Sequence, residues 1–191
     1  MENIILIGFM GVGKGSVARE VIKNSKYMAI DTDDLIESME NRRIKTIFEK
    51  DGEEYFRKLE KNVSRWLEKS VQNTLISTGG GFYKQSNIKN IGIIVLLDSP
   101  FDAIIKRIKE HPNAARKLKK RPLLADLEKA KELYNVRRPE YLKLADIVVN
   151  VNDKSVQECS SELLKKVNKY HTAQLELAQM SLQQRLEPLT H

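Results

Sequence analysis

A glycine-rich stretch near the start of the chain constrains the fold more than any other feature. Residues 8–16 read G-F-M-G-V-G-K-G-S, directly after the apolar run Ile4–Ile7 and at the opening of a helical pattern. This spacing matches G-x-x-x-x-G-K in its strand–loop–helix context, where backbone N–H groups surround a phosphate and the lysine reaches the terminal phosphates. We interpret it as a phosphate-binding loop rather than an ordinary glycine turn. The residues expected to bind the nucleotide here are Gly11, Val12, Gly13, Lys14, Gly15 and Ser16.

Short apolar runs of β type alternate with helical patterns along the rest of the chain. The predicted strands are Ile4–Ile7, Tyr27–Ile30, Thr74–Ser77, Ile93–Leu97 and Ile147–Val151, and the predicted helices are Asp33–Glu40, Glu53–Ser70, Pro100–Lys109 and Ser155–Tyr170. This alternation predicts an α/β fold, a doubly wound five-stranded parallel sheet with helices on both faces. We expect residues 1–170 to form a single domain. Residues 171–191 are expected to be a tail that continues the last helix, is disordered, or is left over from cloning.

Composition narrows the class of protein. The single cysteine, Cys159, excludes an internal disulfide framework and a multi-cysteine metal site. No apolar run approaches the roughly 20 residues that span a bilayer. No basic region precedes the first apolar run, so we expect a cytoplasmic protein without a secretory leader. The net charge of +7 favours anionic partners, either nucleic acid or a small phosphorylated or carboxylated ligand.

Two further clusters follow predicted strands. D-T-D-D occupies Asp31–Asp34 after the second strand, and T-G-G-G occupies Thr78–Gly81 after the third. The carboxyl ends of the strands form the ligand-binding edge of an open α/β sheet. Two carboxylates at i, i+2 could divide between a Mg²⁺ shell and a hydroxyl to be phosphorylated, although Asp31 or Thr32 could simply cap the following helix. Three consecutive glycines form a backbone nest against which a ligand can lie.

Arginines recur at informative positions. Arg57 could be a solvated surface charge, an i, i+3 partner of Glu60, or a ligand-binding group. The basic segment 106–121 loses hydrophobic periodicity and predicts a mobile lid at about residues 110–122, which would bring Arg121 to a transferring phosphate. Arg137 lies two residues before Pro139, which we interpret as starting a helix. No aromatic residue is interleaved with the basic segment, which weakens a stacking platform for single-stranded nucleic acid.

Taken in order, these motifs resemble those of the shikimate kinase family over almost the whole of residues 1–170. The matching segments are G-F-M-G-x-G-K at Gly8–Lys14, D-T-D at Asp31–Asp33, F-R-x-x-E at Phe56–Glu60, G-G-G at Gly79–Gly81, R-P-L-L at Arg121–Leu124 and R-x-P-x-Y at Arg137–Tyr141. The resemblance implies a P-loop kinase that uses ATP and Mg²⁺ to phosphorylate the 3-hydroxyl of shikimate, in aromatic amino acid biosynthesis. It also implies a monomer that binds no nucleic acid and no membrane.

The resemblance implies a role for each matched residue on the acceptor side. Asp33 would bind a hydroxyl of shikimate and act as base toward the 3-hydroxyl. Arg57 and Arg137 would clamp the carboxylate, and Phe48 and Phe56 could wall the apolar face of the ring. The residues expected to bind shikimate are Asp33, Arg57, Gly79, Gly80, Gly81 and Arg137.

On the nucleotide side, the resemblance implies that Lys14 holds the β- and γ-phosphates and that Arg121 reaches the γ-phosphate with the lid. Arg107, aligned through Asp98 at the preceding strand end, would flank the adenine. Lys14, Asp33 and Arg121 are therefore the expected catalytic residues.

One position departs from the family pattern. Gly15 stands where a serine usually supplies a Mg²⁺ ligand, and Ser16 follows it. Mg²⁺ could then be held by phosphate oxygens, waters and Asp31, or Ser16 could substitute with a shifted backbone. We predict weaker affinity for Mg²⁺ or for the nucleotide, since one hydroxyl ligand is missing.

Three other functions stay open at this point. The chain could be another small P-loop kinase, acting on a nucleoside monophosphate or gluconate. It could be a degenerate kinase that binds nucleotide without turnover, for which Gly15 is the main support. It could also bind nucleic acid through the basic segment 106–121.

Overall fold

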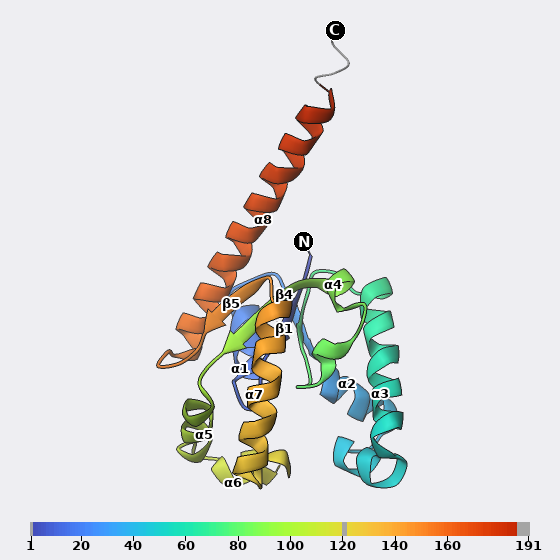
Figure 1. Ribbon diagram of the computed structural model, residues 1–191, viewed down its shortest axis with the longest axis vertical. Helices are drawn as coiled ribbons and strands as arrows, with labels where there is room; N and C mark the ends of the chain where they lie inside the picture. The colour runs from blue at the N-terminus through green and yellow to red at the C-terminus, as the bar shows by residue number, and fades with distance from the viewer. Residues whose placement is uncertain (1, 120–121, 187–191) are drawn as a thin grey trace.

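The computed structural model describes residues 2–119 and 122–186, and its centre is a five-stranded sheet (Figure 1). The strands are β1 (Asn3–Ile7), β2 (Met28–Asp31), β3 (Thr74–Ser77), β4 (Gly92–Asp98) and β5 (Ile147–Asn150). They lie in the order β2-β3-β1-β4-β5, and every neighbouring pair is parallel. The predicted five-stranded parallel sheet is confirmed, and each strand begins and ends within one residue of its predicted bounds.

Helices cover both faces of this sheet. They are α1 (Lys14–Lys23), α2 (Thr32–Glu40), α3 (Ile44–Ser70), α4 (Ile88–Ile91), α5 (Phe101–Lys109), α6 (Ala114–Lys119), α7 (Leu127–Leu144) and α8 (Val156–Leu186), with 3-10 turns η1 (Phe82–Lys84) and η2 (Pro122–Leu124). Figure 1 shows α7 in front of the sheet and α1 behind it. α1 packs against α8, while α7 contacts β4. All of β1 is buried between these layers, as expected of a central parallel strand.

The sheet is tied together at its amino-terminal edge by one buried polar side chain. Asn3 donates its amide to the carbonyls of Val71 (2.7 Å) and Ile91 (3.0 Å), and it accepts from the backbone N–H of Thr74 (3.0 Å). The glycine-rich and acidic segments lie at the opposite edge of the sheet, where the strands end.

α3 and α7 differ from what the sequence predicts. α3 starts at Ile44, but Gly52 interrupts it with φ 82° and ψ 177°, so the predicted helix Glu53–Ser70 is its second segment. Pro139 was expected to start a helix and instead lies inside α7, so that prediction was wrong. The apolar periodicity explains the correction, because the buried residues Ala130, Tyr134 and Tyr141 of α7 share one helical face across the proline.

The last helix does not end at Tyr170. α8 continues to Leu186 and projects away from the sheet (Figure 1), so residues 171–186 of the predicted tail continue the last helix. Its outer part carries the exposed side chains of Leu175, Leu177 and Met180. The predicted lid at about residues 110–122 contains α6, while residues 120 and 121 lie outside the described part of the chain.

Candidate active site

The phosphate-binding loop connects β1 to α1 as predicted. Gly13 caps the helix in the left-handed region, with φ 109°, and its carbonyl accepts the N–H groups of Ser16 (2.9 Å) and Val17 (3.0 Å). Lys14 turns its ammonium back over the loop and donates to the carbonyls of Gly8 (2.6 Å) and Phe9 (3.2 Å). The helix N-terminus and the ammonium together create a site of positive potential for phosphates.

Arg107 reaches the same loop from α5. Its guanidinium donates to the carbonyls of Val12 (2.7 Å) and Gly11 (3.3 Å), and burial lowers its pKa. Asp98, at the end of β4, does not pair with Arg107 but accepts two hydrogen bonds from Arg138, at 3.0 and 2.7 Å. The structure thus places Arg107 beside the nucleotide loop and gives Asp98 a partner on α7 that the sequence prediction missed.

Asp31 ends β2 and caps α2. Its Oδ1 accepts from the N–H groups of Asp33 (3.0 Å) and Asp34 (3.4 Å), so the capping alternative considered from the sequence is confirmed. Its Oδ2 accepts from the hydroxyl of Ser77 (2.7 Å), the residue that faces Asp31 in the register of β2 and β3. Asp31 is thereby fixed at the ligand-binding edge of the sheet.

Asp33 is the perturbed acid of the site. Burial, helped by the carboxylates of Asp31 and Glu60, raises the pKa of Asp33 to about 7, and the ammonium of Lys14 opposes the rise. A carboxyl group that titrates near neutrality is suited to take a proton from a hydroxyl. Asp33 and Lys14 are therefore electrostatically coupled, although they belong to different strand ends.

The triple glycine lies against the side chains of three expected site residues. A Cβ on Gly79 would lie 2.4 Å from Oδ1 of Asp33. A Cβ on Gly80 would lie 3.0 Å from a guanidinium nitrogen of Arg137, and one on Gly81 would lie 2.6 Å from a guanidinium nitrogen of Arg57. One loop thus gathers a carboxylate and two guanidinium groups from three other segments.

Arg57 is held by two glutamates of its own helix. It donates to Glu60 (2.5 Å) at i+3 and to Glu53 (2.8 and 3.1 Å) at i−4. The Glu60 side chain is 1% exposed, and burial raises its pKa although Arg57 opposes the shift. The pairing considered from the sequence is therefore real, and it aims the guanidinium at the triple glycine rather than at solvent alone.

Arg137 reaches the triple-glycine loop from α7. The hydroxyl of Tyr141 donates to the carbonyl of Gly80 (2.7 Å), and the charge of Arg137 beside it opposes the rise in the Tyr141 pKa that burial causes. Phe48 and Phe56 pack together nearby on α3, with ring centroids 4.7 Å apart. The predicted residues Asp33, Arg57 and Arg137 are thus brought together, and Arg121 lies outside the described residues.

Sequence reasoning missed the contacts that lock the acidic and glycine segments to each other. Thr32, fully buried, accepts the N–H of Gly79 through its hydroxyl at 3.1 Å. Ser77 binds Asp31 across the strands. Both contacts follow from the pairing of β2 with β3, so a correct strand order would have revealed them.

The donor groups at this edge suit a cation that arrives with the nucleotide. Asp31 and Ser16 offer one carboxylate and one hydroxyl, and Mg²⁺ bound to nucleotides usually keeps several waters and takes few protein ligands. Within residues 2–119 and 122–186, no group of three or more His, Cys, Asp or Glu side chains is arranged to hold a metal by itself. In the same residues, no helix is both long and apolar enough to cross a membrane.

Comparison with known proteins identifies relatives of the chain. The sequence profile described as shikimate kinase matches residues 10–168. A shikimate kinase from Helicobacter hepaticus is 37% identical over 169 residues, covering 88% of this chain and 98% of that protein. One from Caldanaerobacter subterraneus is 41% identical over 172 residues, covering 86% and 95%. Among solved structures, shikimate kinase from Acinetobacter baumannii in complex with shikimate superposes with a TM-score of 0.78 at 29% identity, covering 89% and 94%.

Proposed function

The chain belongs to the shikimate kinase family, and on that premise we propose that it transfers the γ-phosphoryl group of ATP to the 3-hydroxyl of shikimate. The products are shikimate 3-phosphate and ADP. The observation that carries the proposal is the gathering of Asp33, Arg57 and Arg137 around one triple-glycine loop beside the phosphate-binding loop.

On the acceptor side, two guanidinium groups fit one carboxylate and a near-neutral carboxyl fits a hydroxyl. Arg57 and Arg137 bind the shikimate carboxylate, and the backbone of Gly79, Gly80 and Gly81 lies against the substrate. Asp33, once ionised, takes the proton of the shikimate 3-hydroxyl. The oxygen of that hydroxyl bonds to the γ-phosphorus as the bond between the γ-phosphorus and the β–γ bridging oxygen breaks.

On the nucleotide side, the chain supplies mainly backbone and positive charge. The loop from Gly11 to Ser16 binds the phosphates, and Lys14 exchanges its carbonyl partners for β- and γ-phosphate oxygens. Arg107 flanks the base, and Arg121 closes over the γ-phosphate with the lid. Asp31 and Ser16 would hold Mg²⁺, which neutralises phosphate charge when bound.

The first test is ADP release in a coupled assay with ATP and Mg²⁺, with and without shikimate. We expect release that depends on shikimate, and no comparable release with gluconate or nucleoside monophosphates. A folded, ATP-binding sample without shikimate-dependent release would favour a degenerate kinase. Release with another acceptor would favour a different small-molecule kinase.

A matched pair of arginine variants on α3 tests the acceptor site itself. Arg57→Ala should raise KM for shikimate about 100-fold, because a charged carboxylate loses one of its two guanidinium partners. Arg65→Ala removes an exposed arginine of the same helix and should leave KM unchanged. Equal effects of the two variants would show that general charge, not the Arg57 position, binds the acceptor.

The finer expectations belong to the same proposal. A monomeric cytoplasmic enzyme, acting in aromatic amino acid biosynthesis, is what the reaction and the family membership support. Sedimentation would test the monomer and fractionation the compartment. Nucleic-acid binding at physiological salt would count against assigning the basic segment to a lid.

A further inference from the structure

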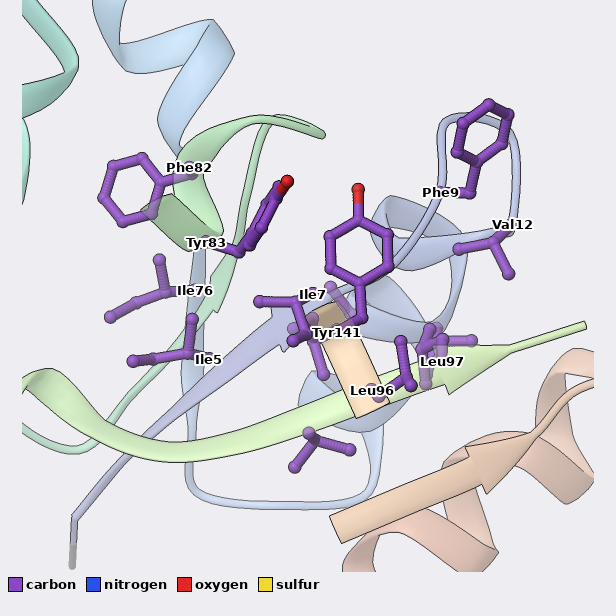
Figure 2. Packing of buried hydrophobic residues seen from close by; sticks show 14 of the residues in the cluster. Ile5, Ile7, Phe9, Val12, Ile76, Phe82, Tyr83, Leu96, Leu97 and Tyr141 are labelled. Atoms are coloured by element: carbon purple, nitrogen blue, oxygen red, sulfur yellow. The ribbon is translucent and has the colours of Figure 1, made fainter. Parts of the chain in front are cut away.

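The triple-glycine loop is joined to α7 by a pair of tyrosine rings. Tyr83 belongs to η1, directly after the loop, and Tyr141 belongs to α7. Their centroids are 4.7 Å apart at an interplanar angle of 76°, and Figure 2 shows the edge of the Tyr141 ring directed at the face of the Tyr83 ring. Both rings are buried, at 7% and 2% exposure. An edge-to-face pair of this kind fixes the two backbones relative to each other.

The two hydroxyls extend the same connection. Tyr141 donates to the carbonyl of Gly80 (2.7 Å), and Tyr83 donates to the carboxylate of Glu140 on α7. Burial and the Glu140 contact both raise the pKa of Tyr83, so its phenol stays protonated and remains a donor at neutral pH. Each tyrosine therefore bonds to the segment that carries the other.

This connection lies beside the proline of α7. Pro139 has no N–H to donate within the helix, so the intrahelical bonding of α7 is interrupted two residues after Arg137. Contacts from outside the helix therefore gain weight in holding this part of α7, which includes Arg137. The Tyr83–Tyr141–Glu140 group, which we call the tyrosine clasp, provides them on the acceptor side.

We propose that Tyr83 is a positioning residue, which acts through the tyrosine clasp to hold Arg137 over Gly80 where the acceptor carboxylate binds. The inference rests on the proposed function of the site. A Cβ on Gly80 would lie 3.0 Å from a guanidinium nitrogen of Arg137 and 3.9 Å from the hydroxyl of Tyr141, which donates to the carbonyl of Gly80. Since Tyr83 bonds to α7 and acts only through it, its loss changes acceptor binding and leaves phosphoryl transfer and nucleotide binding intact.

The variant Tyr83→Phe tests this with little risk to the fold, because it keeps the ring and removes only the bond to Glu140. We expect KM for shikimate to rise about fivefold, with kcat and KM for ATP changed less than about twofold. Tyr134→Phe on α7, the helix that carries Arg137, is the matched control, since the Tyr134 hydroxyl donates to the carbonyl of Ser99 (2.9 Å). It should leave KM for shikimate unchanged.

A double-mutant cycle identifies the route of the effect. Shikimate affinity would be measured by calorimetry for Tyr83→Phe, Arg137→Lys and the double variant. If Tyr83 acts through Arg137, its fivefold effect should disappear in the Arg137→Lys background, whereas independent residues give multiplied losses. Glu140→Gln keeps an acceptor without the charge and should show a smaller rise in KM than Tyr83→Phe.

The outcomes separate this inference from the proposed function. If the wild-type chain neither binds nor phosphorylates shikimate, the proposed function fails and the clasp falls with it. Three results with an active wild type would overturn only the tyrosine clasp. Tyr83→Phe could keep the wild-type KM for shikimate, or it could change kcat and KM for ATP as much as KM for shikimate. The third result is a loss of shikimate affinity in the double variant that equals the product of the losses in Tyr83→Phe and Arg137→Lys. Melting temperatures of the variants would show whether a loss of fold produced a uniform effect.

Discussion

The two glycine clusters of this chain lie at neighbouring strand ends, yet they serve opposite needs. In the phosphate-binding loop, a Cβ on Gly8 would lie 2.6 Å from the carbonyl oxygen of Leu97, and one on Gly11 would lie 2.5 Å from the apolar side chain of Ile108. In the triple-glycine loop, each added Cβ would meet a charged side chain from another segment. Glycine shapes the main chain in the first loop and leaves room for functional side chains in the second.

The difference decides how each region responds to change. The phosphate-binding loop is one continuous segment that binds its ligand largely through backbone groups. A substitution that disturbs this backbone therefore also disturbs the fold. The acceptor cluster joins α2, α3 and α7 through one loop, so a side chain there can be displaced while the sheet stays intact. Substitutions in the two clusters should therefore separate stability from acceptor binding.

The largest effect is expected at Asp33. Asp33→Asn should lower kcat by about 10³-fold, because the proton acceptor is lost while the shape of the side chain is kept. Asp34→Asn, the exposed neighbour, should retain activity and serves as the control. Steady-state kinetics at saturating shikimate would decide, and equal losses in both variants would remove Asp33 from the role of base.

The same carboxyl makes activity and stability depend on pH in opposite directions. With a pKa of about 7, Asp33 must lose its proton to act, so kcat/KM should rise through neutrality. An unfolded aspartate titrates near 3.8, so the native protein holds the extra proton between these values. Its contribution to stability is full below pH 4 and is lost as pH rises through about 7. The melting temperature of Asp33→Asn should therefore gain on the wild type between pH 4 and pH 8.

The next effect is on stability alone. Gly8→Ala should lower the free energy of unfolding by about 2–4 kcal/mol, because φ is 140° and the methyl group would press on a backbone oxygen. Gly15→Ala in the same loop meets only Arg19, at 3.5 Å, and should be tolerated. Denaturant unfolding would compare them, and equal stabilities would contradict the backbone role assigned to Gly8.

A smaller effect, on binding rather than stability, is expected in the second cluster. In Gly81→Ala the added Cβ would lie 2.6 Å from a guanidinium nitrogen of Arg57, so the guanidinium must move. KM for shikimate should rise about tenfold, with an almost unchanged melting temperature. In Gly80→Ala the added Cβ would lie 3.0 Å from a guanidinium nitrogen of Arg137, so KM for shikimate should rise less than in Gly81→Ala. A large loss of stability in either variant would mean that this loop, too, shapes the main chain.

The smallest effect concerns the nucleotide loop and its missing hydroxyl. Gly15→Ser has room for its side chain and should lower the Mg²⁺ concentration for half-maximal activity by about threefold. Calorimetric binding of ATP with and without Mg²⁺ gives a readout that does not depend on turnover. Unchanged Mg²⁺ dependence in both measurements would show that the hydroxyl is not needed.

What the sequence predicts well is what a continuous pattern encodes. The strands and the phosphate-binding loop could be found because apolar runs and glycine spacing are local signals. The acceptor residues could be found only through the order of several motifs, since the spacing of Arg57 and Glu60 equally suits a surface pair. The route from Tyr83 to Arg137 had no local signal, because it depends on how η1 meets α7.

The proline in α7 shows where a local rule fails. A proline after two arginines suggests a helix start, but burial of Tyr134 and Tyr141 on one face holds the helix together through Pro139. Tertiary packing outweighs the lost hydrogen bond there. Arg138 shows the same limit, since its pairing with Asp98 joins α7 to β4 over 40 positions of sequence.

The position of β1 in the middle of the sheet governs how the chain must fold. β1 pairs only with β3 and β4, which follow it much later in the chain, and Asn3 bonds to residues 68 to 88 positions downstream. Closing such long loops precedes any gain from the pairing, which places this topology among the slower folders of its size. The phosphate-binding loop, although it precedes β3 and β4 in the chain, therefore acquires its shape only after these strands have closed on either side of β1.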